Sequence, residues 1–151
     1  MTPFPPTLIL RHRKENLKKC SLRGLEERSD LLFYTYPLKT PLPDLSQYAV
    51  LTLDAPPLKR EEAPLGLVLI DGTWRYAQKM FQTLQSPYVL RSLPSGIQTA
   101  YPRRQDDCPD PTRGLASVEA LYVAYQILGR DCEGLLDHYY WAHKFIRLNY
   151  F

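Results

Sequence analysis

The stretch that decides the fold runs from Leu67 to Met80 and reads LVLIDGTWRYAQKM. It opens with four apolar residues in a row, a pattern typical of a strand buried on both faces of a parallel α/β sheet. Asp71 and the turn residue Gly72 end this run, and an apolar periodicity of three and four residues begins at Tyr76. Ligands of open α/β sheets lie beyond the carboxyl ends of the strands. The stretch therefore predicts a strand, a turn at a ligand site and a helix.

Shorter apolar segments around this stretch predict four further strands, at residues 7–10, 31–36, 48–53 and 88–91. Two more helices are expected after them. One opens at Ser117, the expected N-cap, and ends at Gly129, and the last runs from about Glu133 to Asn149. Strands that alternate with helices predict an α/β fold with a mostly parallel sheet flanked by helices.

Composition and charge fit one folded domain. The chain has 151 residues, of which 44% are hydrophobic, so it can supply a core and disorder is not expected. A formal net charge of +3 is mildly basic and does not by itself indicate nucleic-acid binding. The proline-rich start lacks a signal-peptide pattern, and no apolar run is long enough to span a membrane. These features predict a single cytoplasmic domain, 1–151, with no membrane partner.

The three cysteines, Cys20, Cys108 and Cys132, lie far apart in the sequence. An odd number without a Cys-x-x-Cys pair argues against a disulfide framework and a cysteine zinc site, so free thiols are expected. His138 and His143 are five positions apart, which misses the four-residue spacing of a helical metal pair. We therefore predict no metal. A Cys-His hydrolase that uses Cys20 or Cys108 has no local support in the sequence.

Several short motifs carry a family resemblance. Asp71-Gly72-Thr73-Trp74 resembles the Asp-x-Thr-Trp signature of the DTW-domain family. Five further segments resemble, in matching order, motifs of that family or of the related ribosomal-RNA aminocarboxypropyltransferases: Lys18-Lys19-Cys20-Ser21, Arg91-Ser92-Leu93-Pro94, Tyr101-Pro102-Arg103-Arg104, Leu115-Ala116-Ser117-Val118-Glu119-Ala120 and Tyr140-Trp141-Ala142-His143-Lys144-Phe145. Members of both branches move the aminocarboxypropyl group of S-adenosylmethionine (SAM) onto an RNA base.

The resemblance implies a SPOUT-like α/β domain with a C-terminal trefoil knot, a feature that composition and periodicity cannot show. It also implies SAM as the group donor and RNA as the partner. Some features depart from each branch. Gly72 stands where the ribosomal-RNA enzymes have a cysteine, and Ala142 stands where they have a glycine. The cysteine cluster at the start of many DTW proteins is missing.

The resemblance makes Asp71 and Thr73 the candidate catalytic residues. The expected nucleophile is N3 of a uridine-type base, and Asp71 either accepts its proton or orients the base. Structural alternatives exist for both residues, since either side chain can cap the helix and Asp71 can pair with an arginine. Trp74 is expected to enclose the methyl group and face the sulfonium, or else to be a large core residue.

The remaining candidates are expected to bind SAM or RNA. The resemblance places Ser21 at the carboxylate of the aminocarboxypropyl group, and the other SAM-binding candidates that it implies are Leu93, Leu115, Ala116 and Ser117. Two basic stretches suit phosphate contacts, and their members are Arg11, Arg13, Lys14, Lys18, Lys19, Arg23, Arg103 and Arg104. An exposed, solvated turn explains Lys18 and Lys19 equally well. Glu119 is expected to be structural.

The resemblance thus implies transfer of the aminocarboxypropyl group of SAM to N3 of a transfer-RNA uridine, with release of methylthioadenosine. Modification of a ribosomal-RNA pseudouridine is the nearest alternative. A SPOUT-type RNA methyltransferase and a non-enzymatic RNA-binding module with salt-sensitive affinity are the others. A homodimer is an open option.

Overall fold

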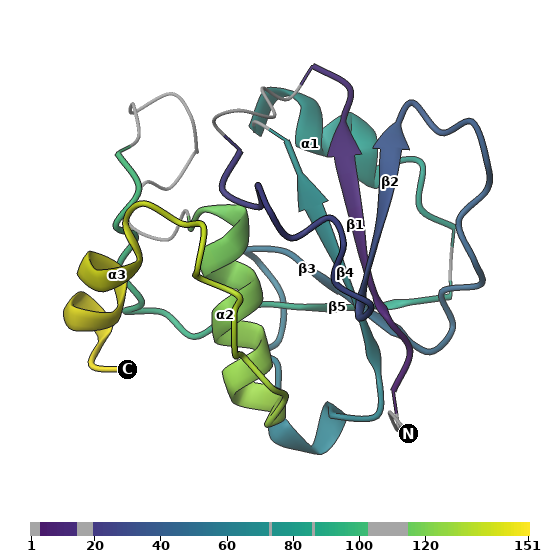
Figure 1. The fold of residues 1–151 in the computed structure, drawn as a ribbon. Helices are drawn as coiled ribbons and strands as arrows, with labels where there is room; N and C mark the ends of the chain where they lie inside the picture. The colour runs from purple at the N-terminus through teal and green to yellow at the C-terminus, as the bar shows by residue number, and fades with distance from the viewer. Residues whose placement is uncertain (1–3, 15–19, 73, 86, 103–114) are drawn as a thin grey trace.

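The computed structural model describes residues 4–14, 20–72, 74–85, 87–102 and 115–151, without the side chain of Trp74. Figure 1 shows a sheet with helices on both sides. The elements in chain order are β1 (Thr7–His12), β2 (Leu31–Tyr36), β3 (Tyr48–Leu51), the 3-10 helix η1 (Arg60–Glu62), β4 (Gly66–Asp71), α1 (Trp74–Phe81), β5 (Val89–Arg91), α2 (Ser117–Leu128) and α3 (Ala142–Asn149).

The five strands form one sheet in the order β2-β1-β4-β3-β5, and every neighbouring pair is parallel. The two strands with the most buried residues, β1 and β4, lie next to each other inside the sheet. Because both faces of these strands are covered, neither face needs polar side chains, which explains their continuous apolar runs. The predicted α/β class is confirmed, and the expected strand segments match the observed ones to within two residues.

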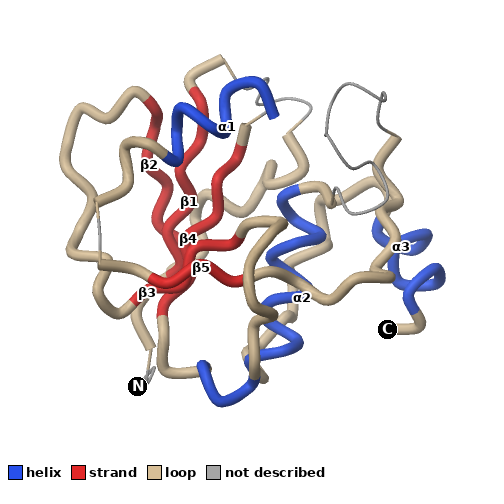
Figure 2. The backbone as a smooth tube through the Cα atoms, turned by 180° about the vertical axis from the view of Figure 1, so that it is seen from behind, coloured by secondary structure: helices blue, strands red, loops and turns tan. Residues whose placement is uncertain are grey.

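Alternate residues of the central strands point into opposite layers. Leu8 and Leu10 belong to an apolar cluster with Met80 of α1, whereas Ile9, between them, belongs to a cluster with Leu121 of α2. This is the two-residue period of a strand, applied to a sheet that has a helix on each face. Figures 1 and 2 show α1 on one side of the sheet and α2 on the other.

The strand that follows β1 in the chain, β2, and the strand that follows β4, β5, lie on opposite sides of this central pair in the sheet order. Beyond β1, Cys20, Leu22 and Leu25 pack in the cluster of α2, whereas β4 leads directly into α1. The gap between these two strands is thus a topological switch point, the place where open α/β sheets bind ligands. Arg11 and Asp71 face each other in the register at this point.

The C-terminal helix is shorter than predicted. The expected span began at about Glu133, but α3 begins at Ala142, and residues 131–141 form successive turns. Gly134 has φ = +83°, a left-handed conformation that interrupts a right-handed helix. Leu135 and Tyr139 still point into the core, as helical spacing suggested. The predicted trefoil knot stays a prediction.

The predicted N-cap of α2 is off by one position. Ala116, with φ of −65° and ψ of 155°, occupies the cap, and Ser117 is the first residue of the helix. Glu119, three positions after the cap, accepts a hydrogen bond from the backbone N–H of Ala116, which is the half of a capping box that needs no side chain at the cap. The predicted end is confirmed, since Gly129 is left-handed with φ = +72°.

Candidate functional site

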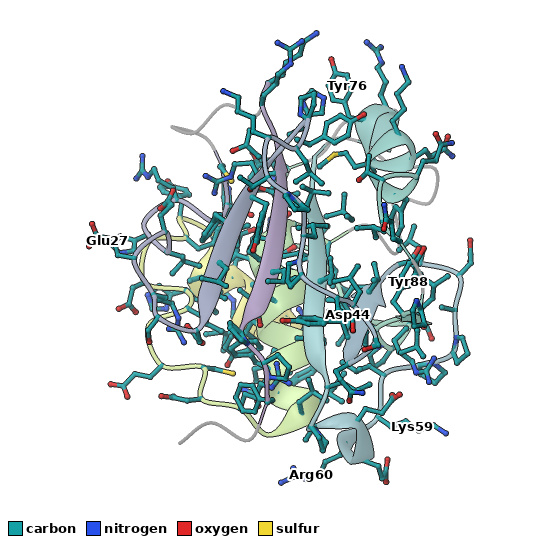
Figure 3. All side chains as sticks on the ribbon, turned by 90° about the vertical axis from the view of Figure 1, so that its right-hand side faces the viewer. Glu27, Asp44, Lys59, Arg60, Tyr76 and Tyr88 are labelled. Atoms are coloured by element: carbon teal, nitrogen blue, oxygen red, sulfur yellow. The ribbon has the colours of Figure 1, made fainter. Side chains whose placement is uncertain are left out.

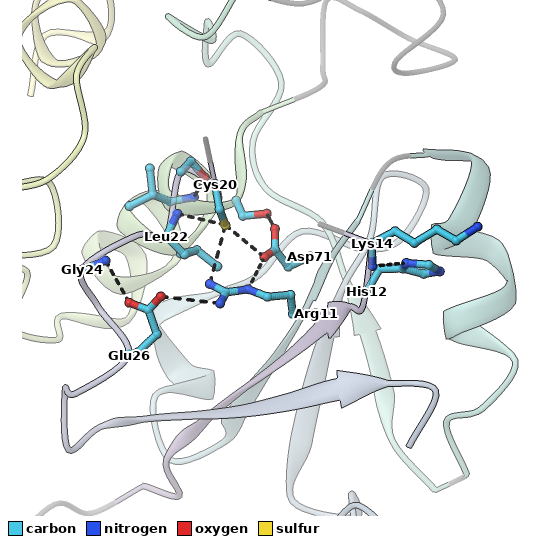
Figure 4. A network of polar contacts seen from close by, with 11 residues as sticks. Arg11, His12, Lys14, Cys20, Leu22, Gly24, Glu26 and Asp71 are labelled. Carbon is cyan, nitrogen blue, oxygen red and sulfur yellow. Dashed lines mark hydrogen bonds and ion pairs between the residues drawn. The ribbon is translucent and has the colours of Figure 1, made fainter. Parts of the chain in front are cut away.

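Asp71 lies at the carboxyl end of β4 and is only 4% exposed. Its Oδ2 accepts hydrogen bonds from Nε of Arg11 at 3.2 Å and from Sγ of Cys20 at 3.4 Å. Its Oδ1 accepts a hydrogen bond from the hydroxyl of Ser117 at 2.7 Å. The carboxylate therefore joins the end of β1, the segment after it and the start of α2, at the switch point of the sheet (Figure 4).

Arg11 is an interior cation with partners at every nitrogen. Besides Asp71, it contacts Oε2 of Glu26 at 3.5 Å and Sγ of Cys20 at 3.6 Å, and its guanidinium lies 4.7 Å from the ring centroid of Phe33. Burial works to lower the pKa of Arg11, but Cys20 and the two carboxylates outweigh it, and the pKa is raised. Since Arg11 is 8% exposed, the phosphate contact expected of it does not fit the structure. Its place is beside Asp71.

Cys20 is a buried hydrogen-bond donor. Burial, and then the negative charge of Asp71, raises the pKa of its thiol to about 12. The thiol is therefore protonated near neutral pH and donates to Asp71, and its sulfur accepts a hydrogen bond from the backbone N–H of Leu22. A protonated, buried thiol is a poor nucleophile, which argues against the hydrolase alternative at this residue.

Ser21 and Ser117 fasten the start of α2 to the switch point. The hydroxyl oxygen of Ser21 accepts a hydrogen bond from the backbone N–H of Val118 at 3.1 Å, so it satisfies one of the free donors of the helix terminus. Ser117 donates to Asp71 from the same turn. These two SAM-binding candidates and the candidate catalytic carboxylate therefore lie together, although they are far apart in the sequence.

Glu119 is a fully buried carboxylate that accepts four hydrogen bonds. Oε1 accepts from the hydroxyl of Thr99 at 2.5 Å and from N–H of Ala116 at 2.8 Å. Oε2 accepts from N–H of Ala100 at 2.8 Å and from the hydroxyl of Tyr139 at 2.9 Å. Glu119 thus ties the segment before residue 102 to the start of α2 and to the C-terminal turns, which agrees with the structural role expected for it.

The apolar SAM-binding candidates border the same segments. Ala116 is buried at the cap of α2, and Leu115 and Leu93 are half-buried against the α2 cluster. Because Glu119 bonds both to Ala116 and to the chain that continues from Leu93, it sets the spacing of the two segments. Small and apolar residues on both segments suit a flat aromatic ring.

The opposite side of the β1 tip carries a second group of side chains. The ring of His12 stacks on Tyr76 of α1 at 4.0 Å between centroids, and the ring of Tyr36 lies 5.4 Å from it. Nδ1 of His12 accepts a hydrogen bond from the backbone N–H of Lys14 at 3.0 Å. Figure 4 shows His12 and Lys14 on the far side of the strand from Arg11 and Asp71. Arg13 and Lys14 are exposed there, as their predicted role requires.

Some of the predicted site residues lie outside the described residues: Thr73, Lys18, Lys19, Arg103, Arg104 and the side chain of Trp74. Arg23 is exposed in the turn after Cys20, and its N–H bonds to the carbonyl of Cys20 at 3.0 Å. Cys20 and Cys132 are free thiols, as predicted, and Cys108 lies outside the described part of the chain.

The described segments contain no group of three or more His, Cys, Asp or Glu side chains arranged to hold a metal ion. No helix within them has the length and apolar content needed to cross a bilayer.

The sequence allowed an arginine beside Asp71 but identified neither Arg11 nor Cys20 as its partner. Arg11 was predicted to face RNA, and Cys20 was predicted to be a free thiol within the motif Lys18-Lys19-Cys20-Ser21. One signal was present in the sequence, because Arg11 follows an apolar strand just as Asp71 does. Parallel strands end at one edge of a sheet, so two such residues meet if their strands are neighbours. That β1 and β4 are neighbours is fixed only by the folded topology.

Neither a family model nor a curated protein sequence matches the chain. A solved structure does: the SAM-dependent rRNA:acp-transferase Tsr3 from Vulcanisaeta distributa. It superposes with a TM-score of 0.71 and 22% sequence identity, over 97% of this chain and 79% of the Tsr3 chain. The likeness shows the fold: this chain shares the α/β architecture of that structure, with its five-stranded parallel sheet flanked by helices.

Proposed function

We propose that this protein transfers the aminocarboxypropyl group of SAM to a base of RNA. One observation carries the proposal. The fold resembles that of an rRNA:acp-transferase over nearly the whole chain, and the motif residues Ser21, Asp71 and Ser117 meet at its topological switch point. Fold alone does not define chemistry, so the positions of these side chains are essential to the argument.

Ribosomal RNA is the better-supported target. The sequence alone favoured a transfer-RNA uridine, because of Thr73 and the Tyr-x-x-Arg turn. The solved structure that the chain resembles is described as an rRNA enzyme, which supports the alternative instead. We therefore propose an rRNA base as the acceptor, with a uridine-type N3 as the attacking atom.

The reaction is a substitution at carbon. The base nitrogen attacks the chain carbon next to the sulfonium, a C–N bond forms, and the C–S bond breaks. The electron pair of that bond neutralises the sulfur, so methylthioadenosine leaves, and the N3 proton passes to a base or to water. The protein must expose this carbon and not the methyl carbon, which makes positioning the main contribution.

Residues at the switch point offer the groups that such a donor needs. The Ser21 hydroxyl accepts a bond from Val118, so its hydrogen is available to donate to the carboxylate of the aminocarboxypropyl group. Oδ1 of Asp71 accepts a bond from Ser117 and keeps a second lone pair, which can receive the base N–H. Arg11 holds this carboxylate in place. Trp74, at the start of α1, is assigned the wall around the methyl group.

The direct test is incubation of the purified protein with SAM and with separate ribosomal and transfer RNA fractions, followed by mass analysis of nucleosides and small molecules. An aminocarboxypropyl adduct in rRNA with methylthioadenosine is expected. A methyl adduct with S-adenosylhomocysteine would replace the proposal by methyl transfer. An adduct confined to transfer RNA would keep the reaction and refute the target.

Two substitutions test the assigned residues. Asp71→Asn is expected to keep SAM affinity and lose turnover, and full turnover would remove Asp71 from the chemistry. Trp74→Ala is expected to lose SAM affinity or to allow methyl transfer, and a variant with neither change would refute its role. Thermal melts of both variants separate these effects from loss of folding.

A further inference from the structure

Four cations gather on the α1 side of the sheet's carboxyl edge: Arg13, Lys14, Arg75 and Lys79. All four are exposed. Arg75 and Lys79 are four positions apart in α1 and so share one face of the helix. Figure 3 shows Tyr76 among long side chains with nitrogen tips at this end of the molecule. We call these four residues the α1 basic surface.

An aromatic stack holds the two halves of this surface together. Tyr76 comes from α1 and His12 from β1, and their rings stack at 4.0 Å with an angle of 18° between the planes. Nζ of Lys14 lies 5.7 Å from the centroid of the Tyr76 ring. The bond from Lys14 N–H to Nδ1 of His12 shapes the turn that carries Arg13 and Lys14. The stacked rings of His12 and Tyr76 therefore hold the backbone segments that carry these cations in fixed positions.

No carboxylate balances the α1 basic surface within the described residues. None of its members takes part in any of the ion pairs found there, which use Arg11, Arg28 and Arg91 as the cations. The sequence explains this, because residues 72–91 contain three Lys or Arg and no Asp or Glu. Exposed cations without partners raise the local positive potential and attract anions.

The α1 basic surface adjoins the candidate active site. A Cβ atom placed on Gly72, the residue after Asp71, would lie 3.4 Å from Cβ of His12. The base of the surface therefore touches the turn that carries the candidate catalytic carboxylate.

We propose that the α1 basic surface binds the sugar-phosphate backbone of the RNA whose base is modified beside Asp71. This inference rests on the proposed function, which supplies RNA as the partner. Phosphate contacts from Lys and Arg orient a nucleic acid without reading its sequence. Arg75 and Lys79 thereby join the RNA-binding set, while Arg11 leaves it.

The composition of the surface favours RNA over other anionic partners. Stable membrane attachment of a basic face needs apolar side chains that insert, but the exposed large hydrophobic residues of the described chain lie elsewhere: Leu32, Val89, Leu90, Tyr140, Tyr150 and Phe151. Protein interfaces are depleted of lysine and centre on an apolar core, which this surface lacks.

Two double variants with equal charge loss test the proposal. Arg75→Gln with Lys79→Gln removes two charges from the α1 basic surface. Lys59→Gln with Arg60→Gln removes two charges around η1, at the opposite end of the molecule in Figure 3. Binding of a fluorescein-labelled, uridine-rich single-stranded RNA is followed by fluorescence anisotropy over a series of salt concentrations.

The first variant is expected to bind RNA on the order of tenfold more weakly at low salt, and the slope of log K against log salt is expected to fall by about 1.4. The control is expected to keep the wild-type slope. An equal loss in both variants would mean that only net charge matters, and an unchanged first variant would mean that RNA binds elsewhere. Either result would overturn the proposal.

Further measurements separate this proposal from the proposed function. SAM affinity and turnover at saturating RNA should be unchanged in the first variant, with only the KM for RNA raised. If the wild type transfers the group and this variant binds RNA as the wild type does, the RNA-binding role of the α1 basic surface is refuted and the proposed function stands. If the wild type transfers nothing but the variant binds RNA more weakly, the surface binds RNA and the proposed function is refuted. Tighter binding to anionic phosphatidylserine vesicles than to RNA would identify a lipid partner and refute the RNA assignment.

Discussion

Positive charge is buried and paired on one side of the β1 tip and exposed on the other. On the α2 side, Arg11 is buried and each guanidinium nitrogen has a partner. On the α1 side, Arg13, Lys14, Arg75 and Lys79 are exposed and form no ion pair among the residues described. Arg11 and His12 are adjacent in the chain, so strand parity alone sends one to each side.

The difference follows from the cost of moving charge out of water. A buried ion is tolerated only when it is paired and hydrogen-bonded, so an interior arginine requires Asp71 and Glu26. An exposed cation keeps its water and can exchange it for a phosphate. The α2 side therefore positions a carboxylate, and the α1 side is free to bind an external anion.

Removing Arg11 is expected to give the largest effect. Arg11→Met leaves Asp71 buried without its cation and should lower the free energy of unfolding by about 3–5 kcal/mol. Urea denaturation measures this change. Arg11→Met combined with Asp71→Leu should recover much of the loss, because no unpaired charge remains. A loss below about 1 kcal/mol for the single variant would mean that the pair behaves like a surface pair, and the comparison would break.

Glu119→Gln tests the other buried carboxylate on the α2 side. The amide keeps the shape but turns one acceptor into a donor, which then meets a hydroxyl or a backbone N–H. The free energy of unfolding should fall by about 1–3 kcal/mol. SAM affinity should fall as well, because Glu119 sets the spacing of the segments around Ala100 and Ala116.

The matched control for Glu119 is Glu61→Gln in η1, where the carboxylate is exposed. Both variants remove one negative charge, and only the first removes buried hydrogen bonds. Chemical denaturation and calorimetric SAM titration of the two variants give the comparison. Equal effects would show that Glu119 acts only through net charge.

Local patterns predicted the architecture well, since parity and apolar runs are properties of the chain itself. They placed the strands, the Asp71 turn and the end of α2 at Gly129. They failed at Glu133–Asn149, where apolar spacing suggested one helix but Gly134 takes a left-handed conformation. Spacing reports which residues face the core and does not report whether the backbone between them is continuous.

The candidate site was predictable only in part. Motif resemblance pointed to Asp71, Ser21 and Ser117, and the structure brings them together. The neighbours of Asp71 depend on strand order, which no local pattern encodes. Arg11 was therefore predicted to be exposed to RNA, whereas it is buried beside Asp71. The absence of acids from residues 72–91 was visible in the sequence, but its meaning required the position of α1.

A smaller effect is expected from the pH response of His12. Burial, and then the charges of Lys14 and Arg13, lowers the pKa of His12 below its ordinary value. Between the folded pKa and the unfolded value near 6.5, the unfolded chain binds more protons, so stability rises with pH there and falls as pH drops below about 6.5.

Thermal melts of the wild type and of His12→Phe between pH 7 and pH 5 check this expectation. Phenylalanine can stack on Tyr76 and Tyr36 but does not titrate, so its profile should be flatter than that of the wild type. A control at the exposed His143, changed to Asn, should keep the wild-type profile. If His12→Phe loses stability with falling pH as steeply as the wild type, another group is responsible.

The smallest expected effect is on the stability of the Arg75→Gln, Lys79→Gln variant. Arg75 lies in the first turn of α1 and opposes the helix dipole, whereas Lys79 lies in the last turn and complements it. The two contributions nearly cancel, and neither side chain has an ion-pair partner within the described chain. The free energy of unfolding should therefore stay within about 0.5 kcal/mol of the wild type in urea denaturation.

A loss above about 1 kcal/mol would show that these cations stabilise the fold, as Arg11 does, and the two sides of the β1 tip would no longer differ. A stable variant that binds RNA poorly would show that the charges on the α1 side serve a partner.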